Sequence, residues 1–246
     1  MESSIPMTTV VFIGNTGAGK STLCNYFRKK LASPQDNQPE SPFHENEEYA
    51  STKMNEPVYE SFSQMRIVDT PGLSDTGGKT VDVKNLSSTT VFIKKLEEVH
   101  AFVFVINWHS PRFDDSTIAT FKTFYTSFGN KFLKNVKFLF TKASKINNAE
   151  AETKKKMDTI YEVLAKEFPS DKDLLTNIEH FLFECNPDYW SDYSEETRIK
   201  LTVRTEEEYK RFSASVSAIE PYDTDLVIDY KVNPKVWEAL ENLNSL

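Results

Sequence analysis

The strongest chemical signal in this sequence is a glycine-rich stretch near the amino end. Gly14-Asn15-Thr16-Gly17-Ala18-Gly19-Lys20-Ser21 fits the pattern GxxxxGK[ST], after an apolar run and before a helical pattern. In that setting backbone N–H groups can surround phosphate oxygens, Lys20 can neutralise the β and γ phosphates, and the Ser21 hydroxyl can ligate Mg²⁺. We therefore expect a nucleotide-phosphate site made by this loop and Thr22.

A second candidate phosphate element lies at the end of another apolar run. Asp69-Thr70-Pro71-Gly72 follows Met65-Arg66-Ile67-Val68, which places a carboxylate at the carboxyl end of a strand, where α/β sheets bind ligands. The string alone is a common turn, but its distance from the phosphate loop favours function. We expect Asp69 to reach Mg²⁺ through water and the Gly72 N–H to meet the γ-phosphate, with residues 74–78 reordering when that phosphate leaves.

A nucleotide switch also needs a hydroxyl between these motifs that contacts both Mg²⁺ and the γ-phosphate. Thr52, in Ser51-Thr52-Lys53, is the best candidate, and Ser51 is its rival. The alternative is a threonine that is merely solvated in a polar loop.

The base pocket is less clearly encoded. GTP-binding folds usually recognise guanine with [NT]KxD, and the matching stretch here is Thr141-Lys142-Ala143-Ser144. Ser144 can accept a hydrogen bond but carries no charge, so guanine discrimination should be weaker or come from elsewhere. Lys142 can lie along the base through its aliphatic stem. Asn186 is placed either to bind the base edge or to form an Asx turn before Pro187.

The pattern of the whole chain predicts a mostly parallel sheet flanked by crossover helices. Strands are expected at residues 8–13, 65–69, 101–107, 136–141 and 180–184, with an edge strand near 57–62. Helices are expected at residues 20–30, 83–98, 114–128, 149–167 and 194–218, and a last short one at 234–244. We interpret residues 1–190 as the nucleotide-binding domain and residues 191–246 as a helical extension packed on it or following it.

Composition excludes several classes of function. The formal net charge of -8 argues against nucleic acid or an anionic membrane as a general electrostatic partner. Cys24 and Cys185 have no metal-ligand spacing, so no disulfide framework or zinc site is expected. No apolar run approaches the roughly 20 residues that span a bilayer, and no signal-peptide pattern is present, so we expect a cytoplasmic protein.

Several segments together carry a family resemblance over residues 8–187. They are the phosphate loop with Asn25, Ser51-Thr52-Lys53, Asp69-Thr70-Pro71-Gly72-Leu73, the box from His100-Ala101-Phe102 through Arg112-Phe113-Asp114-Asp115 to Phe128-Gly129, and Phe140-Thr141-Lys142. In these residues the chain resembles the immunity-associated GTPases, the IAN/IMAP proteins with an avirulence-induced-gene-type G domain. That family is distantly related to septins and to chloroplast import GTPases.

The resemblance implies a P-loop NTPase G domain that binds GTP or GDP with Mg²⁺. It also implies a homodimer or larger oligomer that forms through the nucleotide face in the triphosphate state. The chain departs from the family at Ser144 and in lacking a long coiled-coil or membrane-anchoring tail, so any membrane association would be peripheral and through partners.

Catalysis is expected to be slow in the isolated domain, because Leu73 stands where many small GTPases carry a water-orienting Gln. The resemblance places Arg112 to cross a face-to-face dimer and contact the partner's phosphates. The alternative is a surface Arg that caps its loop or pairs with Asp114 or Asp115. Two other functions stay open: a nucleotide-dependent scaffold with little turnover, and an ATP-using phosphotransferase, which the Asp-Thr-Pro-Gly element disfavours.

Overall fold

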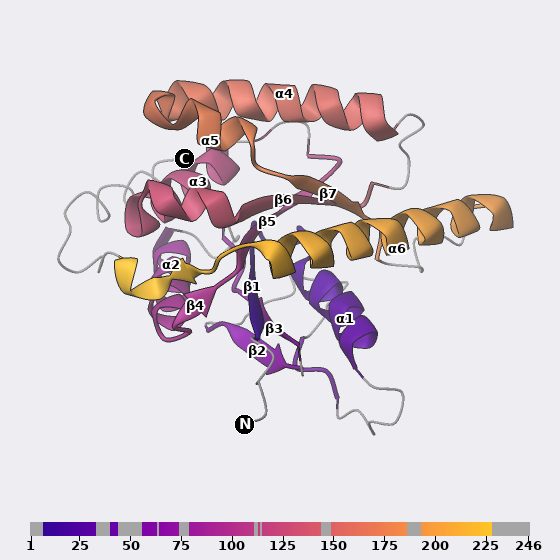
Figure 1. Cartoon of the computed structure of the whole chain (residues 1–246), viewed down its shortest axis with the longest axis horizontal. Coiled ribbons are helices and arrows are strands. Elements are labelled where there is room, and N and C mark those ends of the chain that lie inside the picture. The colour runs from indigo at the N-terminus through magenta and orange to yellow at the C-terminus, as the bar shows by residue number, and fades with distance from the viewer. Residues whose placement is uncertain are drawn as a thin grey trace.

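The structure is a computed structural model that describes residues 7–32, 40–43, 56–62, 64–73, 79–110, 113, 115–143, 149–185 and 193–227. A central sheet is flanked by helices on both faces (Figure 1). This arrangement confirms the expected α/β class.

The main sheet has six strands in the order β2-β3-β1-β5-β6-β7. Their bounds are Thr8–Ile13 (β1), Val58–Ser61 (β2), Met65–Asp69 (β3), Ala101–Asn107 (β5), Val136–Thr141 (β6) and His180–Phe183 (β7). All neighbours pair in parallel except β2, which lies antiparallel to β3 at one edge. Parallel strands covered on both faces read as continuous apolar runs, which explains why the sequence located β5 and β6 so well.

Six helices accompany these strands in the described part of the chain: α1 (Lys20–Leu31), α2 (Lys79–Lys94), α3 (Asp115–Phe128), α4 (Ala149–Glu167), α5 (Lys172–Thr176) and α6 (Glu195–Ala218). Short 3-10 turns occupy Asn130–Asn135, Pro169–Asp171 and Thr224–Leu226. Ser194 caps α6 by accepting the Thr197 N–H at 3.3 Å. The expected helix at 234–244 lies outside the described residues.

The expected helix at 83–98 is wrong at both ends. It runs from Lys79 to Lys94, and Glu98–Val99 instead form the short strand β4, antiparallel to β8 (Tyr222–Asp223). Glu97 adopts a left-handed φ of 67°, which ends helical continuity, and Thr224 donates its N–H and its hydroxyl to the Glu97 carbonyl. These partners lie far apart in sequence, so local periodicity could not reveal them.

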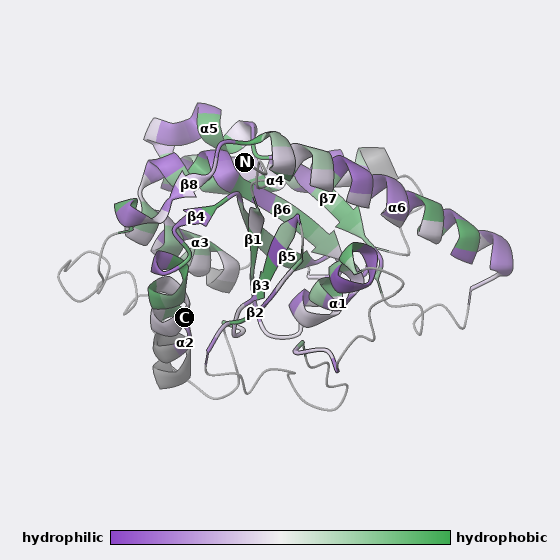
Figure 2. Cartoon of the chain, turned by 60° about the horizontal axis from the view of Figure 1, so that its bottom comes forward, coloured by the Kyte–Doolittle hydropathy of each residue, from purple (hydrophilic) through white to green (hydrophobic). Residues whose placement is uncertain are grey.

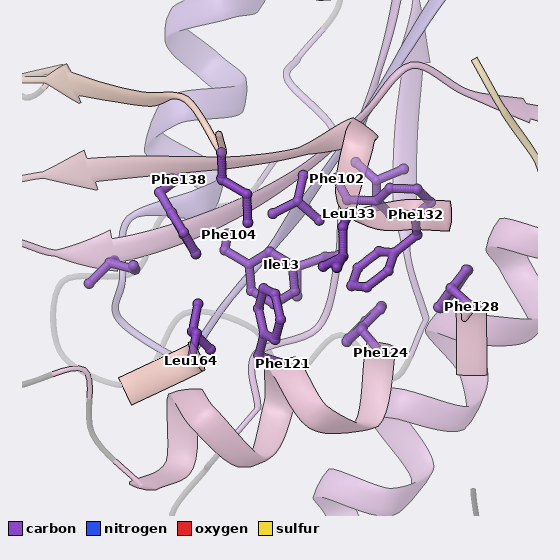
Figure 3. Packing of buried hydrophobic residues seen from close by; sticks show 14 of the residues in the cluster. Ile13, Phe102, Phe104, Phe121, Phe124, Phe128, Phe132, Leu133, Phe138 and Leu164 are labelled. Carbon is purple, nitrogen blue, oxygen red and sulfur yellow. The ribbon is translucent and has the colours of Figure 1, made fainter. Parts of the chain in front are cut away.

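Apolar residues form a separate core on each face of the sheet, as strand alternation requires. One core is rich in phenylalanine and lies between the central strands and α3 (Figure 3). There the Phe104 and Phe124 rings meet edge to face, with centroids 5.8 Å apart. On the other face Phe27 of α1 meets Phe212 of α6 at 5.2 Å. Burying each of these rings contributes about 1.5–3 kcal/mol.

Helix α6 is therefore part of the packed body of the protein. Its Phe212 and Val216 are fully buried in the core beneath the sheet. Figure 2 shows the hydrophobic colour concentrated in the central strands, with hydrophilic residues along the outer helices and α6. Among the described helices, none combines the length and apolar character needed to cross a membrane.

Candidate nucleotide-binding site

The predicted phosphate loop lies between β1 and α1, as expected. Gly14 has a φ of 154°, and a Cβ on it would lie 2.5 Å from the Val105 carbonyl oxygen of β5. Only glycine can therefore begin the loop this close to the neighbouring strand. The first turn of α1 contains no acidic residue, so the positive end of its dipole stays available to an anion.

Lys20 folds back over this loop. Its side chain is buried, and Nζ donates to the carbonyl oxygens of Gly14 at 3.0 Å and Asn15 at 3.1 Å. An ammonium group held at the loop, beside the N-terminus of α1, concentrates positive potential where a phosphate would bind.

Ser21 and Asp69 meet at the carboxyl ends of β1 and β3. Ser21 Oγ donates to Asp69 Oδ2 at 2.6 Å, and the Asp69 side chain is fully buried. Burial raises the pKa of Asp69, and the Lys20 charge, the Ser21 hydroxyl and a backbone hydrogen bond at Thr70 oppose that rise. Among the described residues Oδ1 has no hydrogen-bond partner. The Asp69 carboxylate therefore has one buried oxygen that accepts no hydrogen bond from a described residue, and it lies beside the Ser21 hydroxyl. Oxygen ligands of this kind suit a hard cation such as Mg²⁺.

Within the described ranges no three His, Cys, Asp or Glu side chains cluster to hold a metal ion.

Gly72 is pressed against the phosphate loop. Thr16 N–H donates to the Leu73 carbonyl at 3.1 Å, and Leu73 N–H donates to the Gly14 carbonyl at 3.4 Å. Asn85 of α2 holds the other side by donating Nδ2 to the Gly72 carbonyl at 3.0 Å. The two candidate phosphate elements are thus in direct contact.

Gly72→Ala is expected to lower the free energy of unfolding by about 1–3 kcal/mol, because the added methyl overpacks this contact. The new Cβ would lie 2.0 Å from Thr16 Oγ1 and 2.8 Å from Thr16 Cα. Urea denaturation of the nucleotide-free protein measures the loss. Thr16→Gly in the same chain should restore part of it, and an unchanged stability in Gly72→Ala would contradict the packing described.

The base-loop residues 141–143 are tied to the phosphate loop. Thr141 Oγ1 donates to the Ala18 carbonyl at 2.6 Å, and Lys142 Nζ lies 3.4 Å from the Gly17 carbonyl oxygen. Lys142 also adopts a left-handed φ of 57°, a conformation that a non-glycine residue keeps only when its neighbours hold it. The structure therefore joins the expected phosphate and base elements into one site.

Four expected site residues lie outside the described part of the chain: Thr52, Arg112, Ser144 and Asn186. The others are brought together at one edge of the sheet: the phosphate loop with Thr22, Asp69, Gly72, Thr141 and Lys142.

Some residues that shape this site were not expected from the sequence. Asn85 contacts Gly72, and Arg204 of α6 contacts the base loop. Asn25, which the family resemblance had included, donates Nδ2 to the Phe43 carbonyl at 3.0 Å, and its side chain also accepts from Ser41, which ties residues 41–43 to α1. The sequence gives no signal for Asn85, because most of its neighbours, such as Lys84, Ser87 and Ser88, are polar as well.

Solved structures of Toc33 from Arabidopsis thaliana share this fold. The complex with GDP and Mg²⁺ is 18% identical, with a TM-score of 0.61, and the match covers 89% of this chain and 88% of that one. The complex with Mg²⁺ and GMPPNP is 17% identical, with a TM-score of 0.59 and 88% coverage of each chain.

A third structure comes from chloroplast translocon components whose dimerization is important for their GTPase activity. It is 20% identical, with a TM-score of 0.52, and the match covers 73% of this chain and 70% of that one. No curated protein sequence matches this chain.

The fold is thus that of GTPase G domains, as the sequence resemblance implied. The model of the AIG1 family matches residues 8–167, which include the phosphate loop, Asp69, Gly72 and the base loop. The chain belongs to the AIG1 family.

Proposed function

We propose that this protein binds GTP and GDP with Mg²⁺, hydrolyses GTP slowly and self-associates in the triphosphate state as a nucleotide-dependent switch. The observation that carries the proposal is the buried trio at the phosphate loop. Lys20 and Ser21 are the first two residues of α1, directly after Gly19, and Asp69 ends β3 with a buried oxygen that no described residue satisfies.

In this proposal Ser21, Asp69 and Thr52 hold Mg²⁺. The ion would neutralise charge on the β and γ oxygens of the bound triphosphate. Lys20 adds a cation on the other side of the same phosphates. Gly72 lies against Thr16 of the phosphate loop. Its backbone N–H would donate a hydrogen bond to the γ-phosphate when that phosphate is present.

Guanine selection is proposed to depend on the loop after β6 and on Asn186. The ties from Thr141 to Ala18 and from Lys142 to Gly17 support this, because they set the base loop at a defined distance from the phosphates. With Ser144 in place of Asp the preference for guanine should be modest.

Self-association is supported by the relatives of similar fold, since dimerization is important for the GTPase activity of those chloroplast translocon components. For this chain we propose that the dimer forms through the nucleotide face and that Arg112 crosses it. Leu73, which offers no polar group to orient water, makes outside help more useful.

A calorimetric titration with GTP, GDP and ATP, with Mg²⁺ and after its removal by EDTA, tests the proposal. We expect GTP and GDP to bind several-fold more tightly than ATP. Removal of Mg²⁺ should lower the affinity for GTP more than the affinities for the other nucleotides. Ser144→Asp should widen the margin, because a carboxylate accepts both guanine N–H groups. Equal affinity for ATP and GTP would overturn the guanine assignment, and tighter ATP binding would favour a phosphotransferase.

A further inference from the structure

Helix α6 passes beside β7 (Figure 1). In the described part of the chain β7 is the last strand of the sheet on this side, so one of its edges pairs with no strand. Backbone groups of alternate residues point away from β6 along this edge. Side chains of α6 that lie about one turn apart form hydrogen bonds with these backbone groups. The Thr205 hydroxyl accepts from the Glu184 N–H and donates to the Glu184 carbonyl. Glu208 accepts from the Leu182 N–H, and Arg211 donates to the His180 carbonyl.

Arg204 adjoins this series but contacts a different segment. Its Nη2 donates at 2.8 Å to the carbonyl oxygen of Ala143, in the base loop after β6. The base loop is therefore held from two sides. Thr141 and Lys142 bind the phosphate loop, and Arg204 binds Ala143 from α6.

The guanidinium of Arg204 is partly buried, unlike that of a residue that only fixes α6 to the surface of the protein. Its Nε is buried and has no hydrogen-bond partner among the described residues. Burial lowers the pKa of Arg204, and Glu184 and Glu208 oppose that change. A guanidinium remains charged in such a place, so its bond to the neutral Ala143 carbonyl is charge-assisted and strong.

The loop it holds also needs an external restraint. Lys142 occupies the left-handed region, with Thr141 fixed before it and Ala143 fixed after it. A residue in this conformation relaxes readily if one of its flanking bonds is lost. With the uncharged Ser144 in place of Asp, base selection depends more on the geometry of this loop.

We propose that Arg204 is a positioning residue for the nucleobase. It does not touch the nucleotide; it holds residues 141–143 so that the base loop keeps its position relative to the phosphate loop. This inference rests on the proposed function. It also makes α6 part of the nucleotide site, although the sequence pattern separated it from the site as an extension.

The test compares Arg204→Met with Arg211→Met. Each variant removes one guanidinium bond from α6 to a backbone carbonyl, but Arg211 acts at His180 and stacks on Phe181, away from the base loop. The affinities for GDP and for pyrophosphate are measured with Mg²⁺. Because pyrophosphate lacks the base, the comparison separates the contribution of the nucleobase to binding from that of the phosphates. Arg204→Met should lower the affinity for GDP by about tenfold and leave the affinity for pyrophosphate unchanged. Arg211→Met should leave the GDP-to-pyrophosphate ratio at the native value.

Two further measurements address folding and mechanism. Arg204→Lys keeps one donor and the charge, so it should recover part of the GDP affinity. Hydrogen exchange in the nucleotide-free protein should become faster at residues 141–143 in Arg204→Met and not in Arg211→Met.

A native GDP-to-pyrophosphate ratio in Arg204→Met, or an equal loss in Arg211→Met, would overturn the role of Arg204 and leave the proposed function intact. Failure of the native protein to bind GDP would overturn both.

Discussion

Lys20→Ala is expected to weaken triphosphate binding by about a hundredfold or more while the protein stays folded, because charge-assisted bonds to two phosphates are lost. In the structure the Lys20 ammonium donates hydrogen bonds to the carbonyl oxygens of Gly14 and Asn15 in the loop. Ser21→Asn should have a similar effect by removing the hydroxyl that pairs with Asp69. Calorimetry with GTP and Mg²⁺ measures both variants.

The matched control for Lys20 is Lys30→Ala on the same helix. Lys30 pairs with Glu206 of α6 at the far end of α1, so its loss should leave GTP affinity at the native value. Far-UV circular dichroism reports whether each variant keeps its helices. Native affinity in both Lys20→Ala and Ser21→Asn would remove the phosphate loop from the proposal.

Arg112→Ala is expected to lower GTP turnover by on the order of 10³ to 10⁵ if its guanidinium acts in trans, the range known for arginine fingers. Nucleotide affinity should change far less, because the residue would act mainly on the charge that develops in the transition state. Steady-state hydrolysis measured across a series of protein concentrations tests this. In the native protein the specific activity should rise with concentration, and in the variant the rise should be lost.

Arg66→Ala provides a control for the loss of one positive charge. Arg66 lies on β3, where its guanidinium stacks on Tyr59 of the edge strand, and its loss should leave turnover unchanged. If native turnover does not depend on concentration, or if Arg112→Ala turns over at the native rate, Arg112 takes no part in catalysis and the surface interpretation is correct.

Local pattern was enough to find the strands of the sheet and the glycine-rich loop between β1 and α1. The mostly apolar runs at residues 8–13, 65–69, 101–107 and 136–141 are all strands with those bounds, because a parallel strand buried on both faces reads as a near-continuous apolar run. Gly14 through Ser21 formed the expected loop for an equally local reason. The loop needs its glycines and its lysine at fixed spacing between a strand and a helix.

The predictions from the sequence were wrong or incomplete where segments that are distant in the sequence meet. The helix expected to reach residue 98 ends at Lys94 because Thr224 bonds the Glu97 carbonyl and β8 pairs with β4. The contact of Gly72 with Thr16, and the hold of Asn85 on Gly72, likewise join segments that no periodicity relates.

Residue types and spacing alone thus determined the class of fold and the glycine-rich loop, and they indicated that Asp69 and Gly72 lie near that loop. Tertiary structure alone decided that α6 covers the edge of β7 and that Arg204 reaches the base loop. The physical reason is that a phosphate loop is specified mainly by a short run of consecutive residues, here Gly14 to Ser21. A restraint such as Arg204 on Ala143 exists only once the strands have set the distance between helix and loop.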